Sequence, residues 1–144
     1  GLHLKSKMND FQKITYFDPD RNVYQKFKPH HWEKQHKMDL RYIRETVESS
    51  NEPCVVVTHH APSAKSLDPR FEWDHDGNFG YHSDLENFIH EHPQISHWLH
   101  GHIHHPSDYI VGCTNIICNP YGYCGEEVEF LDKSFYNVYG YENG

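Results

Sequence analysis

The sequence predicts a mixed α/β domain, because a long amphipathic helix pattern precedes two short strand patterns that each end in histidines. The first strand pattern covers residues 54–58 and is followed by His59 and His60. The second covers residues 95–99 and is followed by the segment 100–105, which holds four more histidines. A helix followed by a buried strand is the order of elements found in α/β and α+β folds. The length of 144 residues suits a single domain, residues 1–144, with one core.

The elements before the first histidines are predicted as a strand, a turn and a helix. Residues 14–17 suit a strand, and Asp18-Pro19-Asp20 has the composition of a turn. The segment 31–49 is predicted as a helix preceded by Pro29 and ended by polar residues and Pro53. The continuous apolar run at 54–58 is typical of a strand covered on both faces. The apolar face of the helix repeats at helical spacing and consists of Trp32, His36, Leu40, Ile43 and Val47.

The remaining elements follow in order after the first strand pattern. Residues 64–82 are predicted as a long loop, a length that is typical of functional or mobile segments. A second helix is expected to start at Ser83, with Glu86 completing a capping box, and to end before Pro93. Residues 109–111 and 114–118 suit a hairpin joined by the two-residue turn Gly112-Cys113.

Composition excludes several classes of function. The apolar fraction is 36%, but aromatic residues reach 15%, so the chain is expected to fold as a polar domain. The net charge of −8, with no basic run, argues against non-specific nucleic-acid binding. No run approaches the ~20 apolar residues that span a bilayer, and the four cysteines form no C-x-x-C pair. We therefore expect a cytoplasmic protein with reduced thiols and no membrane partner.

Histidine is the unusual feature of the composition, with 15 residues. Most of these side chains are expected to be solvated, and His36 is expected to pack in the core rather than bind a ligand. Residues two apart in an extended segment point the same way, so His102 and His104 can converge on one centre or on two adjacent ones, and Gly101 would permit a tight turn before them. Three converging imidazoles, with His59 as the third, are enough to hold one Zn, Fe, Ni or Cu ion.

The motifs around these histidines resemble those of calcineurin-like metallophosphoesterases. The segment 55–62 resembles the family's penultimate metal motif, a strand that ends in a ligand histidine. Gly101-His102-Ile103-His104 matches the final G-H-x-H motif. The segment 119–123, Asn-Pro-Tyr-Gly-Tyr, resembles an N-P-x-G-Y segment in a bacterial and phage-type branch. The resemblance covers residues 9–130 and corresponds to the C-terminal half of the family's β-sandwich, which is flanked by helices.

The resemblance implies a hydrolase that cleaves a phosphomonoester or phosphodiester, which could be a nucleotide, with two divalent ions (Mn, Fe, Zn or Ni). His59 and His102 would bind one metal ion and His104 the other. His60 would be the candidate catalytic residue, in contact with the substrate or with the ligands. No family role passes to His97, His100 or His105, for which solvent or loop hydrogen bonds are expected.

The sequence departs from the family pattern in its carboxylates. It contains no D-x-H and no Gly-Asp pair, and Gly77-Asn78 is followed by Phe79 rather than His. The bridging aspartate is therefore absent, and this chain alone is expected to bind one ion at most. We expect uncovered apolar faces that pair with an N-terminal half on another chain or with a second copy. Carboxylate partners for the histidines could come from Asp74, Asp76 or Asp108.

Two other functions are compatible with parts of the pattern. A non-catalytic module that binds a metal or a partner would explain the missing carboxylates. A histidine-triad nucleotide hydrolase would use the alternating His100, His102 and His104, but its motif needs bulky apolar residues between them and leaves His59 and His60 unexplained. The aromatic residues of the loop 64–82 could stack on a base or pack the loop down; they are Phe71, Trp73, His75 and Tyr81.

Overall fold

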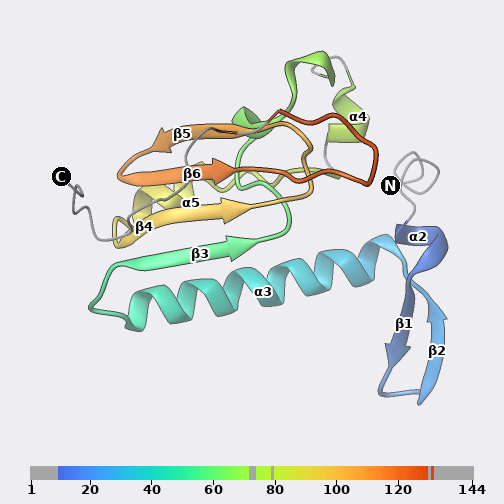
Figure 1. Cartoon of the computed structure of the whole chain (residues 1–144). Helices are drawn as coiled ribbons and strands as arrows, with labels where there is room; N and C mark the ends of the chain where they lie inside the picture. Colours follow the sequence, from blue (N-terminus) through green and yellow to red (C-terminus); the bar gives the residue numbers. More distant parts are fainter. Residues whose placement is uncertain (1–9, 72–73, 79, 130, 132–144) are drawn as a thin grey trace.

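A computed structural model of the protein describes residues 10–71, 74–78, 80–129 and 131. These residues form helices, a two-stranded sheet and a four-stranded sheet, which confirms the predicted mixed α/β class (Figure 1). Within the described ranges, none of the helices has the length and apolarity needed to cross a membrane. All four cysteines are free.

The four-stranded sheet has the order β3-β4-β6-β5. Its strands are β3 (Cys54–Thr58), β4 (Ile95–His100), β5 (Ser107–Val111) and β6 (Thr114–Cys118). Strand β4 is parallel to both β3 and β6, whereas β5 and β6 are antiparallel and joined by the predicted turn, in which Gly112 has φ +59°. Because β3 and β4 run the same way, the segments that follow them leave the sheet at the same edge.

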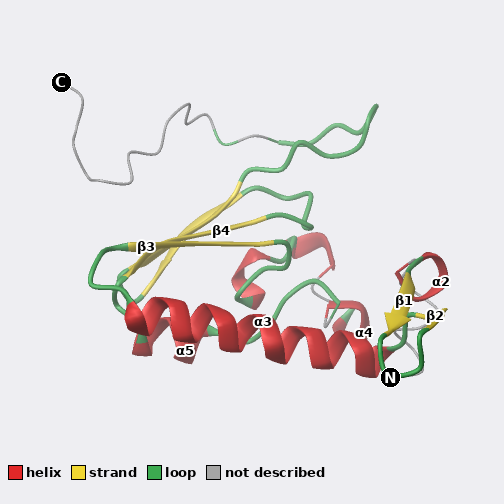
Figure 2. Cartoon of the chain, turned by 90° about the horizontal axis from the view of Figure 1, so that it is seen from below, coloured by secondary structure: helices red, strands yellow, loops and turns green. Residues whose placement is uncertain are grey.

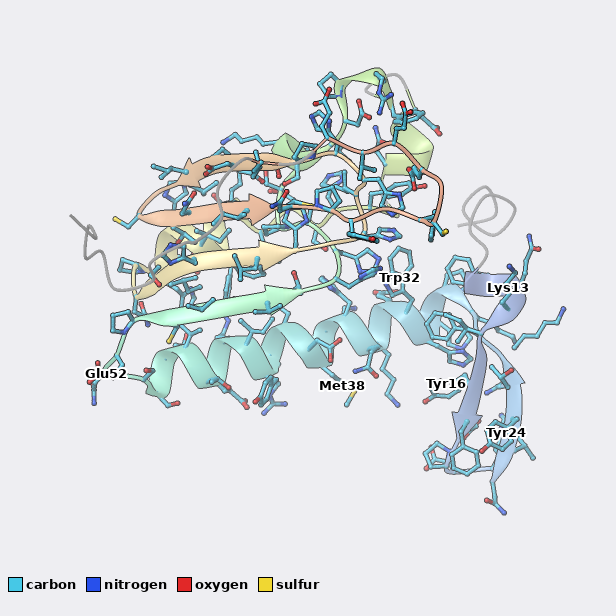
Figure 3. All side chains as sticks on the ribbon, viewed as in Figure 1. Lys13, Tyr16, Tyr24, Trp32, Met38 and Glu52 are labelled. Atoms are coloured by element: carbon cyan, nitrogen blue, oxygen red, sulfur yellow. The ribbon has the colours of Figure 1, made fainter. Side chains whose placement is uncertain are left out.

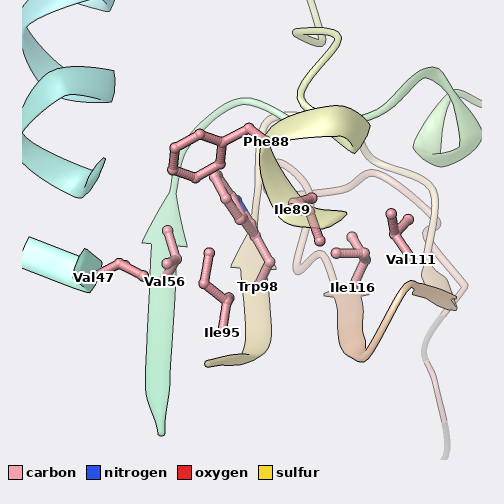
Figure 4. Packing of buried hydrophobic residues seen from close by; sticks show 8 residues of the cluster. All are labelled: Val47, Val56, Phe88, Ile89, Ile95, Trp98, Val111 and Ile116. Carbon is pink, nitrogen blue, oxygen red and sulfur yellow. The ribbon is translucent and has the colours of Figure 1, made fainter. Parts of the chain in front are cut away.

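Two helices cover one face of this sheet (Figure 2). Helix α3 (Pro29–Ser49) contributes Val47 to the core, with Leu40 and Ile43 packed against it, which confirms these three residues of the predicted apolar face. Trp32 instead packs against Phe11 and His60, and His36 is half-buried. The helix begins two residues earlier than predicted, because proline is well accommodated in the first turn of a helix. Helix α5 (Glu86–Glu91) supplies Phe88 and Ile89. The core surrounds Trp98, which is 1% exposed, and Figure 4 shows its eight members.

The opposite face of the sheet carries exposed apolar side chains. Val57 and Ile110 are 71% and 70% exposed, and Val55 is 40% exposed. The prediction that the strand at 54–58 is covered on both faces is therefore wrong. Strand β3 lies at the edge of the sheet and its helices lie on one side, so its apolar run reflects one covered face and one open face.

A hairpin projects from the N-terminal end of α3, away from the sheet, with Tyr24 exposed on it (Figure 3). It consists of β1 (Thr15–Asp18) and β2 (Val23–Lys26) and follows the short helix α2 (Asp10–Lys13). The predicted strand and turn are confirmed, since the carboxylate of Asp18 accepts hydrogen bonds from the backbone N–H groups of Asp20 and Arg21. Tyr16 stacks on His31 of α3 at a centroid distance of 4.1 Å and anchors the hairpin.

The segment between β3 and α5 is more ordered than a loop. It contains 3-10 turns at Ala64–Ser66 and Pro69–Phe71 and the short helix α4 (His75–Asn78). The predicted capping box is wrong, because α5 begins at Glu86 itself. The Glu86 carboxylate instead accepts hydrogen bonds from Ser63 Oγ (2.5 Å) and Lys65 Nζ (2.9 Å), which ties α5 to the first 3-10 turn.

Candidate metal centre

His59, His60 and His102 lie together at the carboxyl ends of β3 and β4. The ring centroids of His59 and His60 each lie 4.7 Å from that of His102, and 5.2 Å from one another. The strand register causes this meeting, because Thr58 pairs with His100 and the backbone N–H of Gly101 donates to the His59 carbonyl (3.1 Å). The sequence placed these residues at the ends of two strands, and the parallel pairing brings them to one point.

Two consecutive hydrogen bonds connect the core to the turn formed by His59 and His60. The indole Nε1 of the buried Trp98 donates to Thr58 Oγ1 at 2.9 Å. The Thr58 hydroxyl in turn donates to the carbonyl oxygen of His60 at 2.7 Å. The backbone of the His59-His60 turn is therefore anchored through one side chain to the centre of the hydrophobic core. The ring of His60, the candidate catalytic residue, lies between His102 and Trp32, whose centroid is 5.8 Å away.

His102 adopts a left-handed backbone conformation, with φ +63°. The sequence suggested that Gly101 would make the tight turn, but the residue with positive φ is His102. Histidine enters this region more readily than most residues, and such strain clusters at functional sites. The Tyr81 ring stacks on His102 at 4.8 Å, and the Nε2 atom of His102 is buried. The described structure thus holds this ring firmly against two other imidazoles and a phenol.

His104 is held separately from this group. Its Nδ1 contacts both carboxylate oxygens of Glu126, at 2.9 and 2.8 Å, and its ring packs edge-on against Tyr123 at 4.7 Å. The pKa of Glu126 lies below its usual value, because the carboxylate accepts the backbone N–H of Tyr123 and also the His104 hydrogen bond. His104 is therefore positioned by the segment after β6, which the sequence did not predict.

His100 belongs to a buried polar network rather than to the histidine group. Its Nδ1 donates to the Gly101 carbonyl (3.0 Å), so in the neutral ring Nε2 accepts from Ser66 Oγ (2.8 Å). Burial lowers the pKa of His100 and favours this neutral form. Ser66 also contacts the Tyr109 hydroxyl at 2.8 Å. The expected loop hydrogen bonding of His100 is confirmed, and the network joins the first 3-10 turn to β4 and β5.

Glu126, the carboxylate that contacts His104, was not among the predicted carboxylate partners. Asp74 Oδ1 accepts from the backbone N–H of Gly77 in α4, and Asp108 is exposed. The side chains of Asp76 and His75, and Trp73, lie outside the described residues. Glu126 was missed because it follows the N-P-x-G-Y segment by a few residues, and only the turn-forming Gly122 and Gly125 indicate that the chain reverses there.

The spacing of the three grouped rings can be compared with that of metal ligands. Two imidazoles on one tetrahedral zinc ion have ring centroids about 5.3 Å apart, since Zn–N bonds are ~2.1 Å long. The His59–His60 centroid distance of 5.2 Å is close to this value, whereas the distances of both rings to His102 are shorter, at 4.7 Å. However, no set of three or more His, Cys, Asp or Glu side chains within the described ranges is arranged to hold an ion. Binding of a shared ion would therefore require the rings to turn and move apart, and further ligands to join them.

Comparisons with known proteins do not indicate an activity for this group of histidines. No family model matches the chain, and no solved structure matches it. The chain is similar to an uncharacterized protein from Acanthamoeba polyphaga mimivirus, with 27% identity over 143 residues. The match covers 94% of this chain and 49% of the viral protein, so the chain spans about half the length of that curated relative.

Proposed function

We propose that this chain supplies the histidine ligands of a metal-dependent phosphoesterase site. The observation that carries the proposal is the meeting of His59, His60 and His102 at the ends of two adjacent parallel strands. Together with the G-H-x-H sequence, this meeting supports a resemblance to the calcineurin-like metallophosphoesterases. The substrate would be a phosphomonoester or a phosphodiester, including nucleotides.

The proposed roles follow the positions of the side chains. His59 and His102 would share one ion and His104 would bind a second, with Mn, Fe, Zn or Ni as candidates. Divalent ions in such sites polarise the phosphate and lower the pKa of a bound water. His60, whose ring packs against both His102 and Trp32, would contact a phosphate oxygen of the substrate. Neutral imidazoles do not balance the charge of two dications, so the proposal requires carboxylate ligands in addition to the histidines.

The proposal is tested by metal binding and hydrolysis in the same samples. Titration calorimetry with Mn²⁺, Ni²⁺ and Zn²⁺ measures affinity, and bis-para-nitrophenyl phosphate reports hydrolysis. We expect His102→Ala to weaken binding by more than about tenfold, since it removes a ligand that orders its neighbours. The control is His90→Ala, which removes an exposed histidine on α5. Equal affinities for the two variants would contradict the assignment of His102.

A second candidate is a metal- or partner-binding module without catalysis. The exposure of Val55, Val57 and Ile110 on the open sheet face favours the partner-binding form of this module. This module would bind at most one ion per chain and would not hydrolyse the phosphodiester. Hydrolysis that disappears both with EDTA and in His102→Ala would exclude it in favour of the enzyme.

A further inference from the structure

We infer that Glu126 is a positioning residue that fixes the tautomer and the direction of the His104 ring, so that Nε2 is the atom offered to a metal ion. This inference deepens the proposed function and rests on it, because it assumes that His104 is a ligand. It concerns a carboxylate that no sequence motif singled out and that the chain itself brings to the ring.

The proton on His104 is located by the chemistry of its partner. Both Glu126 oxygens lie within 2.9 Å of Nδ1. An ionised carboxylate can only accept hydrogen bonds, so Nδ1 must carry the proton. In a neutral imidazole the lone pair then resides on Nε2. Histidines that bind metals through one nitrogen commonly donate the other N–H to a carboxylate, which raises the basicity of the ligand and orients its ring.

The loop that presents Glu126 is itself fixed. The backbone N–H of Glu126 donates to the Tyr123 carbonyl (3.0 Å), and the backbone N–H of Tyr123 donates to Glu126 Oε2 (2.9 Å). Gly122 precedes this turn with φ +74°, and a Cβ there would lie 2.8 Å from Val128 Cγ1 and 3.2 Å from Glu126 Oε2. The positive φ and the lack of space for a Cβ therefore both favour glycine at position 122. The same close packing constrains the Glu126 carboxylate.

This pair differs from the ion pairs on the exposed face of α3. Lys37 and Glu33 are four residues apart on one helix and largely exposed, a type of pair that contributes little. His104 and Glu126 are 22 residues apart, and their side chains are only 29% and 35% exposed. Both carboxylate oxygens contact one nitrogen, and Tyr123 packs against the ring. An incidental surface contact would not need a loop closed by its own reciprocal hydrogen bonds.

The tautomer is measured directly by long-range ¹H–¹⁵N NMR on the metal-free protein at about pH 8.5, where a free imidazole is neutral. We expect His104 to be protonated on Nδ1 in the unmodified protein. In Glu126→Gln the amide can either donate or accept, so we expect the two tautomers to mix. Glu127→Gln removes the same charge from the next residue and is the matched control. His104→Ala assigns the resonance.

Zinc affinity, measured by calorimetry on the same proteins, tests the functional consequence. We expect Glu126→Gln to weaken Zn²⁺ binding 10- to 100-fold, the effect typical of removing such a carboxylate. Glu127→Gln should leave the affinity within about twofold. Tautomer mixing together with this loss supports the inference.

The NMR result separates failure of this inference from failure of the proposed function. An unchanged Nδ1–H tautomer in Glu126→Gln overturns the positioning role, whatever the metal affinity. A mixed tautomer with unchanged Zn²⁺ affinity overturns the assignment of Nε2 as the ligand atom. If the unmodified protein binds no zinc while its tautomer still depends on Glu126, the carboxylate sets the ring as inferred and it is the proposed metal site that is wrong.

Discussion

The histidines of this protein are held in place in two different ways. His59, His60 and His102 meet because two parallel strands end side by side, and hydrogen bonds from Trp98 through Thr58 fix the backbone of the His59-His60 turn. His104 is held by a short loop that closes on itself around Glu126. The first arrangement depends on the hydrophobic core and the second on local hydrogen bonds. Substitutions in the core should therefore disturb one group and spare the other, and the reverse should hold for the loop.

The largest effect is expected for Trp98→Ala. The side chain is 1% exposed and packs edge-on against Phe88, and its loss leaves a cavity at the centre of the core. Removing a buried aromatic residue costs about 3 to 5 kcal/mol of unfolding free energy. Urea denaturation followed by far-UV circular dichroism measures the change.

Ile110→Ala is the control, because Ile110 is 70% exposed on the open face of the sheet and should change stability by less than about 0.5 kcal/mol. A loss of less than about 1 kcal/mol for Trp98→Ala, on the order of an ordinary surface change, would contradict the central place of Trp98 in the core.

A smaller and more local effect is expected for Thr58→Val. The substitution keeps the shape of the side chain but leaves the buried indole N–H of Trp98 without its acceptor, which costs about 1 to 3 kcal/mol. It also releases the His60 carbonyl. We expect the imidazole NMR signals of His59 and His60 to shift while those of His104 stay in place. Thr46→Val on the exposed face of α3 provides a matched control.

The proximity of His59 and His102 could be predicted from the sequence, whereas the separate position of His104 could not. The apolar runs ending in His59 and His100 marked two strands, and neighbouring parallel strands bring their carboxyl ends together. The backbone conformation of the turn at Gly101 and His102 was not predictable. Glycine is the residue expected in a left-handed turn, yet His102 adopts that conformation while Gly101 does not. Ring contacts with His59, His60 and Tyr81 hold His102 there, and those contacts exist only in the folded sheet.

The position of His104 escaped prediction because its contact with Glu126 joins residues that are distant in the sequence. Glu126 reaches His104 across 22 positions, after a chain reversal that no periodic pattern marks. The capping box failed for a related reason, since the Glu86 carboxylate bonds Ser63, 23 residues away, instead of the start of its own helix. Local sequence rules describe neighbours along the chain, and they do not identify which distant side chain will compete for a carboxylate.

The backbone strain at His102 predicts a change in unfolding free energy of intermediate size. His102→Gly and His102→Ala remove the same ring contacts, but only alanine keeps a Cβ in the left-handed region. That conformation costs about 1 to 2 kcal/mol for a residue with a Cβ, so the glycine variant should unfold at correspondingly higher urea concentration. Part of this gain is offset because glycine gains entropy in the unfolded chain. Equal stabilities would show that the turn relaxes when the ring is absent.

The smallest global effect is expected for Gly122→Ala, which disturbs the loop that presents Glu126. The new Cβ would lie 2.8 Å from Val128 Cγ1 at a backbone φ of +74°, so we expect the loop to detach and release Glu126 from His104. Because the contacts that hold this loop are local hydrogen bonds, unfolding free energy should fall by less than about 1 kcal/mol. The His104 tautomer, read by long-range ¹H–¹⁵N NMR, should nevertheless change as it does in Glu126→Gln.

Gly125→Ala separates the two causes of that change. Gly125 also has positive φ, +85°, but a Cβ there meets nothing within 4 Å, so this variant carries the backbone strain without the clash. A tautomer change in Gly122→Ala alone would assign the effect to the packing of the turn around Glu126. If the signals of His59 and His102 moved together with that of His104, the two parts of the site would form a single cooperative unit. The proposed division between histidines held by the core and a histidine held by the loop would then be wrong.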